Sequence, residues 1–337
     1  MTYTATQVRL ATRPQGMTDD STWEITQEQI PDPAAGQVVV EVDHLSLDPA
    51  MRGWLNDVRS YIPPVGIGEV MRAHGTGTVV ASENADYPVG TAVAGMFGAS
   101  EYALCTPAED TEFEKLDTEL APAPTWLGAL GMPGMTAYFG LLDVGRLQAG
   151  DTVLVSGAAG AVGSVVGQLA KAKGAKVIGI AGGPEKCDWL REIGFDGAVD
   201  YKNENPLKKL RELAPKGIDV FFDNVGGEIL DAGLANLARG ARVVICGGIS
   251  SYNEASLPDG PKRYMSLLVF RATMTGFVVF DFKDRYPEAV EEIGRLIRTG
   301  DLVARETVVE GGITQFPEAL NGLFRGINTG KLVLKVK

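Results

Sequence analysis

The sequence predicts an α/β fold: a doubly wound parallel sheet joined to a β-rich segment. Buried runs and helical stretches alternate through the middle of the chain, which indicates parallel strands with helical crossovers. A glycine-rich turn lies between the first of these runs and its helix. Ahead of about Leu120, short alternating runs are separated by proline and glycine clusters. A length of 337 residues leaves room for about two such domains.

The N-terminal segment is predicted to be β-rich and irregular. Val38–Val42 and Thr76–Val80 alternate apolar and polar residues, and the clusters PDPAAG, YIPPVG and YPVG interrupt the pattern. From Thr125 to Leu142 the apolar spacing becomes helical.

The middle of the chain is predicted to alternate strand and helix. The strands are Thr152–Ser156, Lys176–Ala181, Ala198–Asp200, Ile218–Asp223 and Ala241–Cys246. The helices are Gly160–Lys173, Pro184–Glu192, Pro206–Ala214 and Gly227–Leu237. Toward the C-terminus we expect the helices Pro287–Thr299 and Phe316–Arg325 and the strands Glu306–Val309 and Lys331–Lys335.

Composition favours a protein that handles small molecules. Lysine and arginine number 31 against 43 acidic residues, so the formal net charge of −12 argues against nucleic acid and anionic membranes as partners. Cys105, Cys187 and Cys246 are too few and too dispersed for a disulfide framework. The start of the chain, MTYTATQVRLATRPQG, does not have the pattern of a secretory signal. We therefore expect a cytoplasmic protein.

The turn after Thr152–Ser156 has the spacing of a nucleotide-binding loop. Glycines at 157, 160 and 163 follow a G-x-x-G-x-x-G pattern, which misses the usual dinucleotide fingerprint at its second position. Backbone N–H groups at the following helix N-terminus would approach a pyrophosphate. The alternative is that these glycines serve packing alone.

The end of the second strand favours NADP over NAD. An NAD site usually places an acidic residue there to bind the ribose 2′-hydroxyl, but this chain has Gly182. Lys186 lies one turn further on and offers a cation to a 2′-phosphate. Two alternatives stay open: Glu185 as the ribose partner, and Lys186 as an ordinary solvated lysine.

Several segments along nearly the whole chain resemble one known family. They are LSLDPAMRGWLND, SYIPPVGIGEVMRA, LGMPGMTAYFGL, SGAAGAVGSVVGQLAK, GFDGAVDYKN, FFDNVGG, CGGISSYN and GINTGKLVLKV. Together they resemble the zinc-independent medium-chain dehydrogenase/reductases, in the branch of prostaglandin/leukotriene reductases, plant alkenal double-bond reductases and bacterial curcumin reductases. The segment SYIPPVGIGEVMRA is most similar to the curcumin reductases.

The resemblance implies a Rossmann domain inserted in a partly open, GroES-like β-barrel that forms the catalytic and substrate domain. Residues 1–126 and 303–337 would form the barrel domain, and residues 127–302 the NADP-binding domain. A cleft between them would hold the nicotinamide. Family members are often homodimers, so we expect a homodimer.

The resemblance also assigns the residues that bind NADP(H). Ala159, Gly160, Ala161, Val162 and Gly163 would contact the pyrophosphate, and Lys186 and Tyr201 the 2′-phosphate. The remaining cofactor residues would be Met132, Thr136, Asn224, Cys246, Gly247, Gly248, Ile249, Ser250, Tyr252, Phe277, Val278, Val279 and Asn328. Without the family, Tyr201 is equally a half-buried tyrosine at a strand end, Asn224 a turn cap and Cys246 a small core residue.

No metal site is predicted. The chain has two histidines, His44 and His74, which we expect to be structural, and Cys105 has no neighbouring cysteine. His74-Gly75 matches the start of the zinc family's metal loop, but Thr76 stands where a glutamate would follow. Without ligands for a Lewis acid, alcohol oxidation is disfavoured.

Reduction of a C=C bond conjugated to a carbonyl requires less of the protein than alcohol oxidation does. Hydride goes to the β-carbon, charge builds on the carbonyl oxygen, and a tyrosine hydroxyl can stabilise it. The candidate catalytic residues are Tyr252, Tyr61 and, less directly, Tyr264, because the family tyrosine before Met274 aligns with Val269 here. The substrate candidates are Arg52, Trp54 and Tyr61, and Ala50 replaces a family tyrosine.

The sequence thus predicts NADPH-dependent reduction of the C=C bond of α,β-unsaturated ketones or aldehydes, such as curcumin-like or 15-oxoprostaglandin-like enones. Two alternatives are an NADPH-dependent quinone oxidoreductase of the same fold and a non-catalytic NADPH-binding sensor.

Overall fold

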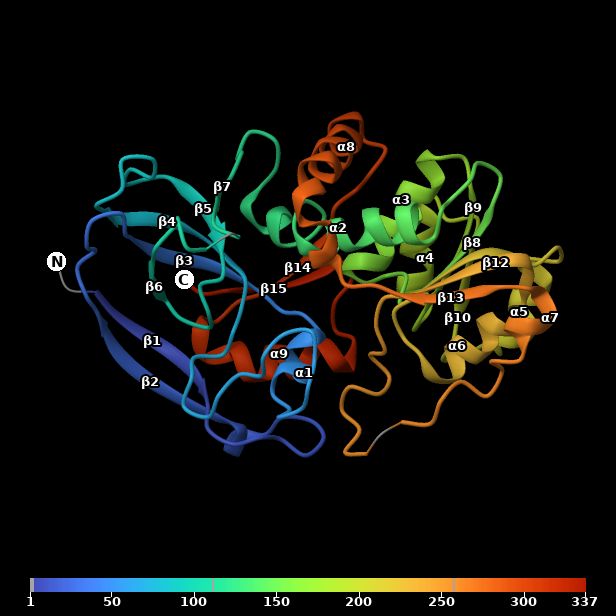
Figure 1. Cartoon of the computed structure of the whole chain (residues 1–337), viewed down its shortest axis with the longest axis horizontal. Helices are drawn as coiled ribbons and strands as arrows, with labels where there is room; N and C mark the ends of the chain where they lie inside the picture. Colours follow the sequence, from blue (N-terminus) through green and yellow to red (C-terminus); the bar gives the residue numbers. More distant parts are fainter. Residues whose placement is uncertain (1–2, 111, 257) are drawn as a thin grey trace. The chain divides into compact units, whose positions relative to one another are not determined.

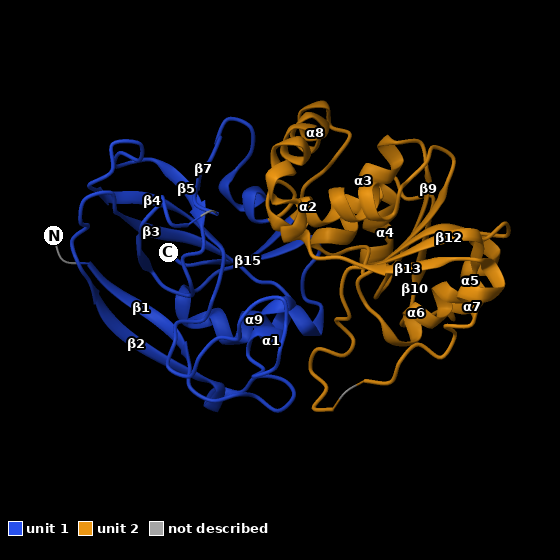
Figure 2. Ribbon diagram, viewed as in Figure 1, with its two compact units in different colours: residues 1–127, 306–337 blue, residues 128–305 orange. Residues whose placement is uncertain are grey.

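The computed structural model describes residues 3–110, 112–256 and 258–337. The chain forms two compact units (Figure 2). Unit 1 comprises residues 1–127 and 306–337, and unit 2 comprises residues 128–305.

Unit 1 is built on β-structure. Its first two strands form an antiparallel hairpin. Its other strands belong to a mixed sheet in the order β14-β15-β3-β4-β5-β7, and β6 pairs with β3 beside this path. The strands are β1 Tyr3–Leu10, β2 Trp23–Ile30, β3 Val38–Ser46, β4 Gly75–Ser82, β5 Ala92–Gly95, β6 Tyr102–Cys105, β7 Glu114–Lys115, β14 Glu306–Val309 and β15 Lys331–Lys335.

Strand β3 organises this sheet because it pairs with β4 along most of its length on one edge, and with β6 and β15 at its two ends on the other edge. Its apolar positions are fully buried in a core that also holds residues of β15 and of the helices α1 (Ala50–Trp54) and α9 (Phe316–Arg325). Segments from both ends of the chain therefore share one core. This confirms the prediction that a parallel-sheet domain is inserted in a β-rich domain.

Unit 2 contains a six-stranded sheet with all pairs parallel, in the order β10-β9-β8-β11-β12-β13. This is the strand order of dinucleotide-binding sheets, in which the chain reverses direction across the sheet next to the first strand. The strands are β8 Thr152–Ser156, β9 Lys176–Ala181, β10 Gly197–Asp200, β11 Ile218–Asp223, β12 Leu237–Ile245 and β13 Thr273–Gly276.

Helices cover both faces of this sheet. Figure 1 shows α2, α3 and α8 on one side of the strands and α5 and α6 on the other. The helices are α2 Met132–Phe139, α3 Ala161–Ala172, α4 Pro184–Glu192, α5 Pro206–Leu213, α6 Gly227–Leu234, α7 Ser266–Phe270 and α8 Tyr286–Thr299. None of the helices within the described part of the chain is long and apolar enough to cross a membrane.

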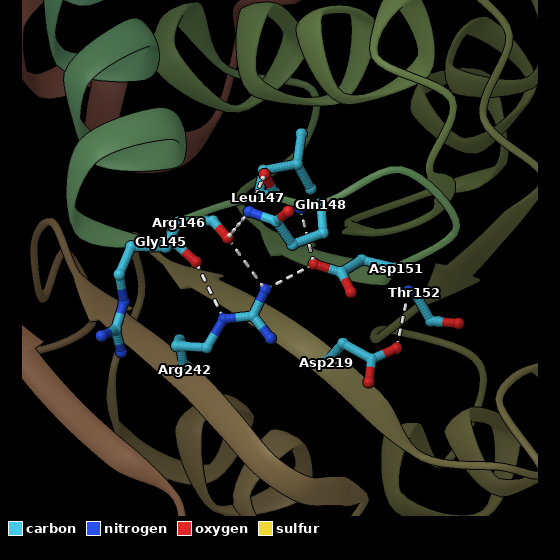
Figure 3. A network of polar contacts seen from close by, with 8 residues as sticks. All are labelled: Gly145, Arg146, Leu147, Gln148, Asp151, Thr152, Asp219 and Arg242. Carbon is cyan, nitrogen blue, oxygen red and sulfur yellow. Dashed lines mark hydrogen bonds and ion pairs between the residues drawn. The ribbon is translucent and has the colours of Figure 1, made fainter.

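The amino ends of the strands are fixed by a polar network around Arg242 of β12 (Figure 3). Its guanidinium donates to the carbonyl oxygens of Gly145 (2.9 Å) and Arg146 (3.2 Å) and pairs with Asp151. The Thr152 N–H donates to the Asp219 carboxylate at 2.9 Å. The network lies at the amino ends of the strands, so the residues at their carboxyl ends remain available to form a site.

Most predicted elements are confirmed. Two helical stretches have other bounds, β12 begins at Leu237 and not at the predicted Ala241, and one strand was missed. The stretch Thr125–Leu142 is not one helix, because a 3₁₀ turn, α2 and a π-helical turn at Gly140–Val144 divide it. The helix predicted to reach Leu237 ends at Leu234, since Leu237 already pairs with Ile218 in the sheet. Strand β13 was not predicted at all.

Candidate functional site

The candidate site in unit 2 lies at the carboxyl ends of the parallel strands. The turn after β8 contains Gly157, whose φ of +57° is in the left-handed region. A Cβ atom on Gly163 would lie 2.5 Å from the Gly157 carbonyl oxygen, so α3 packs directly on the turn. Gly160 is the N-cap of α3 and has no side chain to occupy the first N–H groups of the helix. This turn has the features of a phosphate-binding loop.

At the end of β9, Gly182 lies against the side chains of Tyr201 and Lys202. A Cβ atom on Gly182 would lie 2.8 Å from Cε1 of Tyr201 and 3.0 Å from Cε of Lys202. Burial and the nearby Lys202 ammonium both lower the pKa of Lys186. The predicted pair Lys186 and Tyr201 therefore belongs to one corner of the sheet, and Lys202 lies there as well.

Asp200 connects the two turns at this corner. Its carboxylate accepts hydrogen bonds from Gly183 N (2.8 Å), Lys202 N (3.1 Å) and Asn203 Nδ2 (2.7 Å). Burial raises the pKa of Asp200, but these donors outweigh it and the pKa is lowered. The sequence did not indicate this role, because a strand-end aspartate has the same appearance whatever it accepts.

Asn224 links the carboxyl ends of β8 and β11 by hydrogen bonds. Its Nδ2 donates to the Ser156 carbonyl oxygen at 2.7 Å, and its backbone N–H donates to Ser156 Oγ at 2.8 Å. Ser156 Oγ in turn donates to the buried Asp223 carboxylate at 2.6 Å. Burial raises the pKa of Asp223, against the hydrogen bonds that it accepts from Ser156, Val225 and Gly226. Asn224 thus positions the strand ends around the turn.

The segment after β12 is held against the segment after β11. The N–H groups of Cys246, Ile249 and Ser250 donate to the carbonyl oxygens of Asp223, Asn224 and Val225, respectively. Burial, reinforced by Asp223, raises the pKa of the Cys246 thiol to about 12, so this cysteine is not a nucleophile near neutral pH.

Tyr252 folds back over this segment. Its hydroxyl oxygen accepts the Gly248 N–H at 3.1 Å, and a Cβ atom on Gly247 would lie 2.9 Å from that oxygen. The absence of a side chain at Gly247 therefore lets the phenol reach the carboxyl end of β12. A hydroxyl that accepts a backbone N–H is a more polarised donor toward another oxygen.

The residues predicted at the nicotinamide end also gather in unit 2. The Tyr286 hydroxyl donates to the Val279 carbonyl oxygen at 3.2 Å and lies 3.7 Å from the Met132 sulfur. A Cβ atom on Gly140 would lie 2.6 Å from the Phe277 ring. The Thr136 hydroxyl donates to the Met132 carbonyl oxygen at 2.8 Å. Sequence reasoning missed Tyr286, which is the first residue of an amphipathic helix and has no motif around it.

The remaining predicted residues lie in other places. In unit 1, the buried Arg52 donates to Gly16 O, Pro14 O and Asn56 Oδ1, so its guanidinium holds the chain around α1. Trp54 is half-buried below the Arg72 guanidinium, and its indole N–H has no acceptor among the described residues. Tyr61 is 59% exposed in the loop after α1, and Asn328 is buried. In unit 2, Tyr264 is 58% exposed just before α7.

The two histidines lie in unit 1, and His44 is half-buried. His74 Nε2 lies 2.9 Å from Glu112 Oε2, and burial lowers the pKa of His44 more than Asp43 raises it. Within residues 3–110, 112–256 and 258–337, no three His, Cys, Asp or Glu side chains are grouped to hold a metal ion. The absence of a metal site stays a prediction.

The chain is similar to known proteins over nearly its whole length. A family model described as the N-terminal domain of oxidoreductase matches residues 6–113, and one described as zinc-binding dehydrogenase matches residues 161–295. The chain is 39% identical to NADPH-dependent curcumin reductase of Escherichia coli (strain K12), covering 97% of this chain and 95% of that protein. It is 41% identical to 2-alkenal reductase (NADP(+)-dependent) of Nicotiana tabacum, covering 90% and 88%. The crystal structure of CurA in complex with NADPH from Vibrio vulnificus superposes with a TM-score of 0.92 at 41% identity, covering 98% and 99%.

Proposed function

The chain belongs to the zinc-independent medium-chain dehydrogenase/reductase family, in the branch of curcumin, prostaglandin and alkenal reductases, and we propose that it reduces α,β-unsaturated ketones and aldehydes with NADPH. The observation that carries the proposal is the carboxyl end of the parallel sheet. There a glycine turn fits a pyrophosphate, Gly182 stands where an NAD site has an acidic residue, and a tyrosine hydroxyl accepts a backbone hydrogen bond.

The residues present fit NADPH. Ala159 to Gly163 would hold the pyrophosphate by backbone N–H groups, and Lys186 with Tyr201 would hold the 2′-phosphate. In unit 2, the nicotinamide half would be held by Asn224, Met132, Thr136 and the segments 246–252 and 277–279. Asn328 of unit 1 remains a candidate cofactor residue from the family resemblance. When bound, NADPH supplies the hydride that the β-carbon of the substrate receives.

The protein's part in the reaction is to orient the substrate and to stabilise charge on its carbonyl oxygen. As the β-carbon gains hydride, the carbonyl oxygen becomes an enolate, and a phenol O–H can donate to it without carrying charge near neutral pH. Tyr252 is our first candidate for this donor because Gly248 N–H fixes its oxygen. Tyr61 and Tyr264 are further candidates for this donor, and both side chains are more than half exposed. Trp54 remains a candidate for contact with the substrate. A proton from water or from the ribose hydroxyl of the cofactor then adds to the α-carbon of the enolate, and the carbonyl group forms again.

Arg52 has a positioning role in this proposal. Its guanidinium donates to three acceptors within unit 1, so it shapes the segment before Trp54 and Tyr61 rather than binding a substrate carbonyl.

Steady-state kinetics test the proposal. The purified protein should oxidise NADPH in the presence of benzylideneacetone or a 2-alkenal, with a higher kcat/KM than with menadione as a quinone. Faster turnover of menadione would replace the enone by a quinone as the substrate. Tight NADPH binding without turnover of either substrate would instead identify a sensor.

We also propose that the enzyme is a homodimer and works in the cytoplasm. Strand β13 is the edge of the six-stranded sheet and pairs with β12 alone, and its four residues are exposed. Beside it lie exposed apolar side chains, of which Leu268 is 70% and Val269 58% exposed. A second copy of the same edge would cover this surface. The three free cysteines fit a reducing compartment, and recovery of the native protein from an oxidising compartment would contradict the location.

A further inference from the structure

We propose that Lys202 is a second cation of the 2′-phosphate site, so that Lys186 and Lys202 together select NADP(H) over NAD(H). The inference rests on the proposed use of NADPH and assigns a role to a residue that the sequence did not single out.

The geometry places Lys202 at the correct strand end. Strands β9 and β10 pair in parallel up to Ala181 and Asp200, and the Tyr201 N–H donates to the Ala181 carbonyl oxygen at 3.1 Å. The residues after both strands therefore lie side by side. The side chain of Lys202 approaches Gly182 so closely that a Cβ atom there would lie 3.0 Å from Lys202 Cε. This is the position at which an NAD site places its acidic residue.

The two lysine ammonium groups at this corner favour the binding of an anion. The ammonium groups of Lys186 and Lys202 repel each other, and this repulsion adds to burial in lowering the pKa of Lys186. A phosphate monoester carries between one and two negative charges near neutral pH and would relieve the repulsion. Both ammonium groups can donate to its oxygens, because each has three N–H donors on a flexible stem.

The Asp200 carboxylate at this corner does not take the place of that anion. It attracts Lys202, but its oxygens accept the backbone N–H groups of Gly183 and Lys202 and the amide of Asn203. These hydrogen bonds fix the turn after β9 and the turn after β10. Asp200 therefore holds the backbone that carries Lys202.

Helix α4 adds to the preference for an anion at this corner. It begins at Pro184, directly after Gly182 and Gly183, and its N-cap contributes no side-chain hydrogen bond. The positive end of the helix dipole thus lies beside both lysines.

Calorimetric titration with fragments that lack the nicotinamide separates this role from catalysis. The probes are adenosine 2′,5′-bisphosphate and 5′-AMP, and the proteins are wild type, Lys202→Met, Lys202→Arg, Lys186→Met and the control Lys216→Met. Lys216 is an exposed lysine that precedes β11, at the opposite end of the sheet, so its removal matches the change in net charge. Lys202→Met should weaken binding of the bisphosphate about tenfold and leave 5′-AMP unchanged. Lys202→Arg should restore binding, and Lys216→Met should bind as wild type does.

The failures are distinguishable. If Lys202→Met keeps the wild-type preference for the bisphosphate while Lys186→Met loses it, the role of Lys202 is wrong and the use of NADPH stands. If Lys202→Met weakens both probes equally, Lys202 acts on the fold and not on the phosphate, which also overturns the inference. If wild type does not prefer the bisphosphate over 5′-AMP, the NADPH proposal fails as well.

Discussion

At the scale of residues, buried carboxylates and small residues place the groups that we assign to the reaction. Asp200 and Asp223 each accept several hydrogen bonds at a strand end, and each therefore fixes a turn. Gly247 and Gly248 have no side chains where the Tyr252 phenol packs. The chemistry of the site depends on these supporting contacts, because a donor must be held in place before charge develops.

Replacement of Tyr252 by phenylalanine tests the proposed hydroxyl donor. The change removes the O–H and leaves the ring, so kcat on benzylideneacetone should fall by about a hundredfold while the Kd of NADPH changes little. Steady-state kinetics and a fluorescence titration of NADPH measure the two quantities. Tyr61→Phe and Tyr264→Phe rank the other candidates, and Tyr87→Phe, whose ring packs on Phe113 in unit 1, is the control. An unchanged kcat for Tyr252→Phe removes this residue from the mechanism.

The sequence predicts part of this site and not the rest. Gly182 and Lys186 follow from the local order of residues at a strand end, because a missing acid and a nearby cation both favour a 2′-phosphate. Lys202, Asp200 and Tyr286 could not be found in this way. Their roles come from contacts between segments, such as the Tyr286 hydroxyl with the Val279 carbonyl oxygen, and no periodicity records such contacts.

At the scale of elements, burial decides which strands the sequence reveals. Strands β8, β9 and β11 are short apolar runs that are almost wholly buried, and their predicted bounds are those of the structure. Strand β13, TMTG, is exposed at all four positions and ends in glycine, so it has neither an apolar run nor an alternation. It forms a strand because β12 beside it offers a row of backbone partners. The apolar pattern of the sequence therefore reveals an exposed edge strand less well than a buried strand.

The exposed edge leads to a prediction about assembly. Leu268→Glu places a charge on the apolar surface beside β13, and desolvation of that charge should prevent a second copy from docking. Wild type should have the mass of two chains by light scattering after gel filtration, and Leu268→Glu the mass of one. Val89→Glu is the control, because Val89 is 63% exposed and belongs to unit 1, whereas β13 belongs to unit 2. A wild-type protein that is monomeric at micromolar concentration, or a Leu268→Glu variant that remains dimeric, contradicts the interface.

At the scale of the whole molecule, the fold combines two units with different tasks. Unit 2 has the strand order of a nucleotide-binding sheet, and its polar network at the amino ends of the strands stabilises the side away from the proposed site. Unit 1 holds segments from the two ends of the chain in one core. It contains Trp54, the last residue of α1, and Tyr61 in the loop after that helix. The net charge of −12 does not oppose an anionic cofactor, because salt screens distant charges over about 8 Å and local lysines decide.

Deuterium tracing tests the central claim most directly. Benzylideneacetone is reduced with each of the two C4-deuterated epimers of NADPH, and the product is analysed by NMR and mass spectrometry. Because the proposed reaction delivers hydride to the β-carbon, one epimer should give the saturated ketone with deuterium at that carbon and an intact carbonyl group. Deuterium on the carbinol carbon of an allylic alcohol would show carbonyl reduction and would contradict the account.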